Sequence, residues 1–334
     1  MYNVTFANFI CKFGEEYIMN DYLNGIVLPS FFDDKLFRQY GEENIYFIYE
    51  PELVYLSKED DIVGIWGTFV KDSLLQRSHT YDSQEGIREE PTSLEAATFA
   101  QFLLILNNHR LIYLPMTRDA PSLQNFQTTI KKFLNIKHDE FLRTEKHRLN
   151  EQSQRATIKG LAHIHPKPTL DVEYLVSKRA LSVYLDQFQK LQSLTIRVMD
   201  TNQEAEYSDL IDDIRELSKP INPDRTQLSW ANSEGLNIDH VREPVDAFAH
   251  GEKVHMTLKG QGHEGTKMQV DNEKLRLKVE HESLPAENND LVKLMYQDYI
   301  NQAANVTSSG DISIGPNPLG SLEKIDITDI HNDE

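Results

Sequence analysis

The amino-acid sequence predicts an α+β protein. We expect an N-terminal mixed-sheet domain with hairpins, a polar connecting helix, and a C-terminal mixed α/β domain that ends in a β-meander and a helix. Runs rich in β-branched and aromatic residues dominate the first third of the 334 residues. The second half instead alternates amphipathic helical segments with short strand patterns. This length predicts two domains, 1–149 and 150–303, followed by an acidic disordered tail at 304–334.

The first elements are strands with one helical pattern between them, at 15–25. The strand patterns occupy 1–10, 44–56 and 61–72. The polar segment 73–90 has no period and predicts a loop. The stretch LLILNNHRLIYLP, residues 103–115, contains a polar island between two apolar runs. Asn107 and Asn108 tolerate the left-handed conformation of a tight turn, so we expect a hairpin there rather than a catalytic site.

Two helices are expected after the hairpin. Pro121 and Ser122 begin the first, and its apolar residues recur on one face. The second, 139–155, contains few apolar residues and is expected to be a solvated connecting helix with charge pairs four residues apart. It could also bridge two domains, pack against a partner chain or lie on a phosphate backbone.

The C-terminal half begins with a strand and turn at 156–176. There His163 and His165 would share one strand face, a geometry that metal sites use, but two ligands do not define a site. Helical patterns follow at 177–190, 204–219, 237–250 and 286–303. Strand patterns follow at 193–200 and 225–232, with a three-stranded meander at 252–260, 265–271 and 273–280.

Charge is unevenly distributed along this acidic chain. A formal charge of −19 disfavours indiscriminate binding to polyanions. Residues 131–180, however, contain eleven basic and six acidic residues, a charge of +5, which leaves −24 elsewhere. Aromatic residues are few in this window, so it favours contact with a double-stranded DNA backbone over base stacking. The predicted nucleic-acid contacts are Lys131, Lys132, Lys137, Arg143, Lys146, Arg148, Arg155 and Lys159.

Familiar catalytic signatures are missing from the sequence. It contains no GxxxxGK[ST], GxSxG, HExxH or paired CxxC pattern, and its GxGxxG match, Gly260 to Gly265, lies between two strand patterns and not before a helix. The glycine-rich stretch 259–267 lies between two strand patterns and predicts a hairpin loop. We predict no catalytic residue, cofactor or metal ligand and favour a protein that is not an enzyme. The acidic pairs Asp171 and Glu173, and Asp271 and Glu273, leave a metal-dependent nuclease open as an alternative.

The N-terminal part has an order of elements found elsewhere. This order of elements is seen in the stretches GIWGTFVKD, FLLILNNHRLIYLP and APSLQNFQTTIKKFL. Through this order, residues 1–135 resemble in outline the RexA-like and Kiwa-type antiphage defence proteins of bacteria. The resemblance implies a cytoplasmic defence component that senses or binds nucleic acid, and it carries over no site residue.

The expected function is therefore that of a non-catalytic DNA-binding component of a bacterial antiphage defence system, acting as a homodimer. The first alternative is a protein-interaction adaptor that binds a basic partner through its acidic surface and tail. The second is the metal-dependent nuclease. No signal peptide and no run of 18 apolar residues is visible, so we expect a cytoplasmic protein that does not insert into the membrane.

Overall fold

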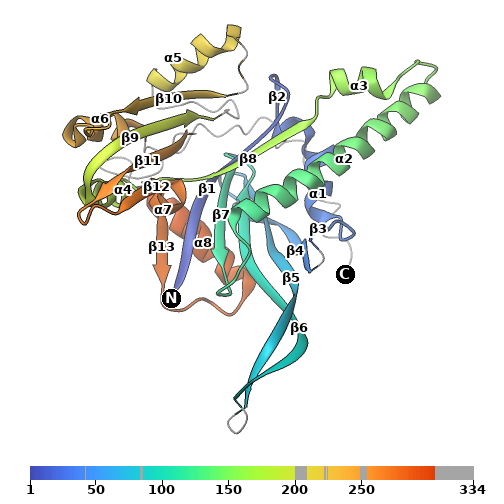
Figure 1. Cartoon of the computed structure of the whole chain (residues 1–334). Coiled ribbons are helices and arrows are strands. Elements are labelled where there is room, and N and C mark those ends of the chain that lie inside the picture. Colours follow the sequence, from blue (N-terminus) through green and yellow to red (C-terminus); the bar gives the residue numbers. More distant parts are fainter. Residues whose placement is uncertain are drawn as a thin grey trace.

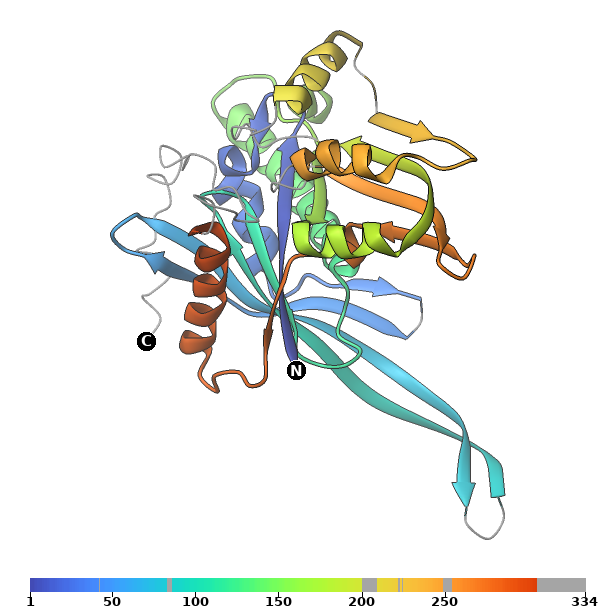
Figure 2. The ribbon, with the colours of Figure 1, turned by 90° about the vertical axis from the view of Figure 1, so that its left-hand side faces the viewer.

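The computed structural model describes residues 1–41, 43–82, 86–199, 209–221, 223, 225–248 and 254–304. Within these residues the chain forms eight α-helices and thirteen strands, arranged in a nine-stranded and a four-stranded antiparallel sheet. The predicted α+β class is confirmed. Figures 1 and 2 show the two sheets beside each other, with the long helix α2 (Leu123–Glu151) next to the larger one.

The larger sheet, as far as the structure describes it, comprises β1 (Tyr2–Phe13), β2 (Tyr17–Ile18), β3 (Arg38–Tyr40), β4 (Asn44–Ser57), β5 (Ile62–Asp82), β6 (Gly86–Ile105), β7 (Arg110–Pro115), β8 (Pro168–Tyr174) and β13 (Lys278–His281). Its order is β13-β1-β7-β6-β5-β4-β3, and β2 and β8 also pair with β1. Consecutive strands from β3 to β7 are neighbours because short turns join them.

Strand β1 uses both of its edges. Thr5 pairs with residues of β7 and β13, and Ala7 pairs with residues of β7 and β8. Strands β8 and β13 therefore share the edge of β1 that faces away from β7. Segments from both sides of the expected boundary at residue 149 thus lie in one sheet. The domain division itself stays a prediction, and the tail beyond Ala304 lies outside the described residues.

Helices cover both faces of the larger sheet. On one face, Phe126, Ile130 and Phe133 of α2 are buried in the same core as the strand residues and α1 (Leu28–Phe32). On the other face, Met295 and Tyr299 of α8 (Asn288–Ala304) are buried with residues of β1, β5, β6 and β7. No helix in the described part of the chain is long and apolar enough to span a membrane.

The smaller sheet contains β9 (Phe188–Val198), β10 (Thr226–Ala231), β11 (Val254–Gly262) and β12 (Lys267–Asp271), in the order β10-β9-β11-β12. Its residues alternate between two faces, as the period of two requires. Ile196 and Met256 belong to the apolar face, whose core also contains residues of α4 (Lys178–Gln187) and α6 (Ile238–Phe248). The opposite face is polar and carries Arg197 and His255. Two short helices complete this half, α5 (Asp209–Ser218) and α7 (Asn272–Leu275).

The polar island at residues 107–109 is a turn, as predicted. His109 adopts a left-handed backbone conformation with φ of 53°. The Asn107 side chain accepts a hydrogen bond from the Val63 amide at 2.9 Å, and Asn108 donates one to the Tyr299 hydroxyl at 2.8 Å. These asparagines therefore fasten the β6–β7 turn to β5 and to α8.

Several predicted elements are wrong. Residues 73–82 and 86–90 do not form a loop but the outer part of β5 and β6, which Figures 1 and 2 show projecting away from the molecule, and 83–85 lie outside the described residues. The two helices expected after Ser122 form the single helix α2, because no Gly or Pro interrupts them. Residues 15–25 contain β2, a 3₁₀ turn and part of a π-helical turn instead of an α-helix.

Two further corrections concern the C-terminal half. The segment after Thr157 begins with a helix, α3 (Ile158–Ile164), because the Thr157 hydroxyl caps it by accepting from the Gly160 amide. The predicted meander has only two of its three strands. After β12 the chain forms α7, and the third predicted strand, β13, then pairs with β1 of the larger sheet and not with β12.

Candidate functional site

The outer face of α2 carries four of the eight basic residues that the sequence singled out. At about 100° per residue, Lys131, Lys132, Arg143 and Lys146 fall within about 120° of one another around the helix. The first three are exposed and Lys146 is half-buried. Arg155 lies beyond the end of α2 and Lys159 on α3, and both are exposed. We refer to these six residues as the basic stripe.

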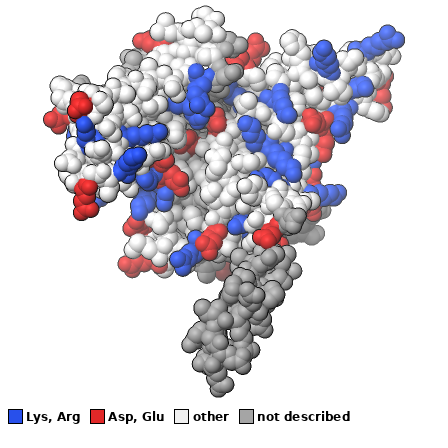
Figure 3. Space-filling model, in the orientation of Figure 1, with Lys and Arg blue, Asp and Glu red and all other residues white. Residues whose placement is uncertain are grey.

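The cations of the basic stripe are not neutralised by carboxylates of the described residues. Among the residues that the structure describes, none of the six forms an ion pair with a carboxylate. The four acidic residues of α2 are instead near other side chains: Asp139 contacts His138, Glu140 pairs with Lys137, Glu145 with Arg148, and Glu151 with His147. Figure 3 shows the resulting Lys and Arg side chains over α2 and α3. The basic stripe therefore remains able to bind an external anion.

Lys137 does not lie on this face. It is only 9% exposed, and its Nζ lies 2.5 Å from Asp33 Oδ2 and 2.8 Å from Glu140 Oε2. Burial alone would lower the pKa of Lys137, but its hydrogen bonds to the two carboxylates outweigh that effect and raise the pKa. The Lys137 ammonium therefore holds α2 against the segment after α1.

Arg148 is also engaged within the protein. Its Nε and Nη2 donate to the two carboxylate oxygens of Glu145, at 2.8 and 2.5 Å. This forked pair lowers the pKa of Glu145. Of the eight predicted contacts, six thus have no carboxylate partner among the described residues, and two are paired with carboxylates of the protein itself.

A second feature, the polar cleft, lies between the start of α2, strand β8 and the polar face of the smaller sheet. It is an open cavity of about 490 Å³. Gln124 and Gln127 line it from α2. The other lining residues used below are Asp171 and Glu173 from β8, Thr195 and Arg197 from β9, Arg225 and Gln227 at β10, and His255 and Thr257 from β11.

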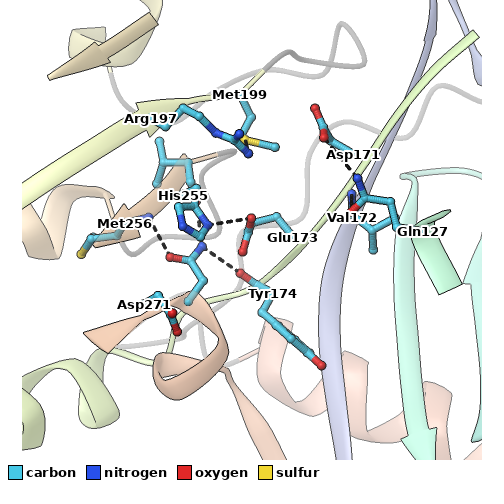
Figure 4. Close-up of polar contacts among 12 residues, drawn as sticks. Gln127, Asp171, Val172, Glu173, Tyr174, Arg197, Met199, His255, Met256 and Asp271 are labelled. Atoms are coloured by element: carbon cyan, nitrogen blue, oxygen red, sulfur yellow. Dashed lines mark hydrogen bonds and ion pairs between the residues drawn. The ribbon is translucent and has the colours of Figure 1, made fainter. Parts of the chain in front are cut away.

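An ion pair crosses the polar cleft. His255 Nδ1 lies 2.9 Å from Glu173 Oε2, and the Glu173 side chain is 14% exposed. The hydrogen bond to Glu173 raises the pKa of His255 above its usual value, although burial opposes the shift. Figure 4 shows the two side chains pointing toward each other. Farther along β8, Asp171 accepts a hydrogen bond from Gln127 at 3.3 Å.

Asn272 positions the two strands that carry this ion pair. Its buried side chain accepts from the Met256 amide at 2.8 Å and donates to the Val254 carbonyl at 2.8 Å, so it binds both neighbours of His255. The same amide also contacts the Tyr174 carbonyl, directly after Glu173, at 3.4 Å. Figure 4 shows these bonds on Met256 and Tyr174. One side chain thus aligns β11 with β8.

The two histidines first considered as metal ligands do not lie on a strand. His163 and His165 were expected on one face of a strand, but α3 occupies that segment. His165 is half-buried, its Nδ1 lies 2.8 Å from the Tyr22 hydroxyl, and burial lowers its pKa. Among the described residues, no three His, Cys, Asp or Glu side chains group as a metal site.

Of the two acidic pairs considered for a nuclease, one lines the polar cleft and the other lies at the start of α7. Asp171 and Glu173 both line the polar cleft. Asp271 instead caps α7, where it accepts from the Lys274 amide at 3.4 Å. Arg197 and His255 were not predicted as site residues. The available signal was the alternation of polar and apolar residues in β9 and β11, but that pattern does not show what the polar face meets.

The described surface thus contains an exposed row of cations and a polar cleft next to the start of the same helix. In comparisons with models of protein families and with curated proteins, this chain matches none.

Proposed function

We propose that this protein is a non-catalytic nucleic-acid-binding protein that holds the backbone of double-stranded DNA against the basic stripe. The observation that carries the proposal is a set of six cations that have no carboxylate partner in the described part of a chain whose net charge is −19. Cations that contact phosphates release condensed counterions, and this release drives binding. The resemblance of residues 1–135 to defence proteins supports a cytoplasmic role in bacterial antiphage defence.

The dimensions of α2 suit a duplex. From Lys131 to Lys146 the helix rises about 22 Å, at about 1.5 Å per residue. That length matches the rise of about six base pairs, at about 3.4 Å each. The two aromatic residues of this region, Phe133 and Phe141, pack inward, Phe133 in the core and Phe141 against Tyr22. Backbone contact therefore fits this surface better than stacking on single-stranded bases.

The test is binding to a labelled duplex across a salt series. The variant changes Lys131, Lys132, Arg143 and Lys146 to Ala. The matched control changes four exposed lysines elsewhere to Ala, namely Lys58, Lys259, Lys267 and Lys293, which removes the same charge. We expect the stripe variant to bind more weakly and to lower the slope of log affinity against log salt by about 3 to 4.

Two results would contradict the proposal. One is the absence of binding by the wild-type protein at low salt. The other is an equal loss in both variants, which would reflect net charge rather than the basic stripe. The same duplex incubated with Mg²⁺ tests the nuclease alternative, because strand cleavage would replace the non-catalytic proposal.

A second candidate function is protein contact, either with a second copy in a homodimer or with a partner of an adaptor. It is favoured by exposed aromatic residues at the β3–β4 end of the larger sheet, where Tyr40 is 64% and Tyr49 52% exposed. Tyrosine is enriched at protein interfaces. Sedimentation of the wild type and of Tyr40→Ser with Tyr49→Ser tests this candidate. If a homodimer persists in the variant, the β3–β4 edge is not the dimer interface.

A further inference from the structure

Arg197 stands in the polar cleft without a carboxylate partner. In the described part of the chain, its one hydrogen-bond acceptor is the Met199 sulfur, a weak acceptor, 3.0 Å from Nη2. Its Nε is buried and has no partner at all. A guanidinium that loses water without gaining an oxygen acceptor is costly. Arg197 is therefore poised to accept an external ligand that supplies such oxygens.

A second guanidinium lies on the same face of the sheet. Arg197 pairs with Gln227 across β9 and β10. Because strand residues alternate faces, Arg225, two positions before Gln227, points to the side that Arg197 occupies. Arg225 is exposed, lines the polar cleft and forms no ion pair within the described residues. Two free guanidinium groups thus face one cavity from neighbouring strands.

The described acidic side chains of the cleft are bound to other residues and do not pair with Arg197 or Arg225. Glu173 is bound by His255, and Asp171 is bound by Gln127. The groups that face His255 are Glu173 from β8, Arg197 from β9 and Asp271 at the end of β12. Glu173 thus forms its ion pair with His255 and not with an arginine, so the two arginines remain available to a ligand.

The chemistry of the cleft indicates the ligand. Arginine binds phosphate oxygens with two parallel hydrogen bonds, and a phosphate monoester offers three terminal oxygens and close to two negative charges. Thr257 and Gln227 add neutral hydrogen-bonding groups to the lining. The volume of about 490 Å³ lies in the range of small-molecule sites. Among the described lining residues there is no Phe, Tyr or Trp that could stack on a base.

We propose that the polar cleft binds a phosphate monoester, with Arg197 and Arg225 as its principal ligands. Two molecules carry this chemistry: a free nucleotide or sugar phosphate, and the 5′-phosphorylated end of a nucleic-acid strand. Recognition is directed to the phosphate and not to the base. The site uses none of the residues of the basic stripe, so it stands independently of the proposed function.

Titration calorimetry with adenosine monophosphate tests the site, with adenosine as the ligand that lacks the phosphate. We expect wild-type protein to bind the monophosphate and not adenosine. Arg197→Gln and Arg225→Gln should each weaken binding at least about tenfold. Because Arg225 is exposed, its variant tests the site even if Arg197→Gln affects folding. The matched control is Arg242→Gln, whose guanidinium pairs with Asp186 away from the cleft and which should bind normally.

The variant that lacks four lysine and arginine residues of the basic stripe should still bind adenosine monophosphate, which separates this site from the duplex surface. Oligonucleotides with a 5′-phosphate or a 5′-hydroxyl identify the source of the phosphate: a preference for the phosphate indicates a strand end, and equal affinity indicates a free metabolite. The proposal is overturned if millimolar adenosine monophosphate produces no binding, or if both arginine variants bind it as the wild type does.

Discussion

The carboxylate of Glu173 and the imidazole of His255 join the two sheets across a distance of 2.9 Å. Glu173 belongs to β8, which pairs with β1 of the larger sheet, and His255 belongs to β11 of the smaller one. The contact is partly shielded from water, so screening weakens it less than it weakens a surface pair. It makes the association of the two sheets sensitive to the protonation of one histidine.

Stability should depend on pH through His255. Its pKa in the folded state is raised, chiefly by the hydrogen bond to Glu173, above the ordinary value of about 6.5. The stabilisation is therefore fully present below that ordinary value and is lost as pH rises through the raised pKa. Thermal unfolding between about pH 6 and 9 measures this. Glu173→Gln should flatten the dependence, and an unchanged profile would show that the pair does not link the sheets.

Asn272→Ala should destabilise the protein and disturb the ion pair. The substitution leaves the Met256 amide and the Val254 carbonyl without their buried partner, at a cost of about 1–3 kcal/mol for each group. Urea unfolding measures the loss of stability. An NMR titration of His255 provides the specific readout, because its pKa should move back toward the ordinary value. A stable variant with an unshifted His255 pKa would refute the positioning role.

Lys137→Ala and Lys131→Ala should have opposite consequences. Lys137 forms charged hydrogen bonds to Asp33 and Glu140 in a buried position, so its loss should cost about 1.5–3 kcal/mol of stability. Lys131 is exposed and without an ion pair among the described residues, so its removal should change stability by less than about 0.5 kcal/mol. Duplex binding should respond to Lys131→Ala alone. The reverse pattern would place the DNA surface on the inner side of α2.

Gly260→Ala should disrupt the smaller sheet. A Cβ atom at this position would lie 2.1 Å from the Lys190 carbonyl oxygen, at an irregularity in the β9–β11 pairing. The clash involves backbone on both strands, so we expect a loss of about 1–3 kcal/mol or more in urea unfolding. Gly265→Ala is the control: nothing lies within 4 Å, and only the positive φ of 72° opposes it. Equal losses would contradict the steric explanation.

The sequence predicted elements best where apolar residues and local capping agree. Ser122 accepts from the Asn125 amide and begins α2 where Pro121 and the apolar period placed it. The turn at Asn107 was predicted from residue type alone. By contrast, 73–90 has no apolar period, and its strands are defined by pairing with each other. That pairing is invisible to a local pattern.

The candidate site was only half predictable. Charge counting found the basic stripe, but it could not distinguish Lys131 from Lys137, because the separation depends on the side of α2 that meets Asp33. The polar cleft needs residues from Gln124 to Thr257, brought together by the contact between two sheets. Local sequence carries no information about that contact. His255 accordingly looked like one polar residue in an alternating strand.

The pairing of β1 on both edges has a consequence for synthesis of the chain. Tyr2 pairs with His281, so β1 is synthesised 279 residues before its partner in β13. At about 5–20 residues per second, that interval lasts roughly 15–55 seconds. During it, one edge of β1 offers unpaired amides and carbonyls to any neighbouring nascent chain. Until translation has supplied β8 and β13, that edge is therefore a site where the nascent chain can pair with the wrong strand.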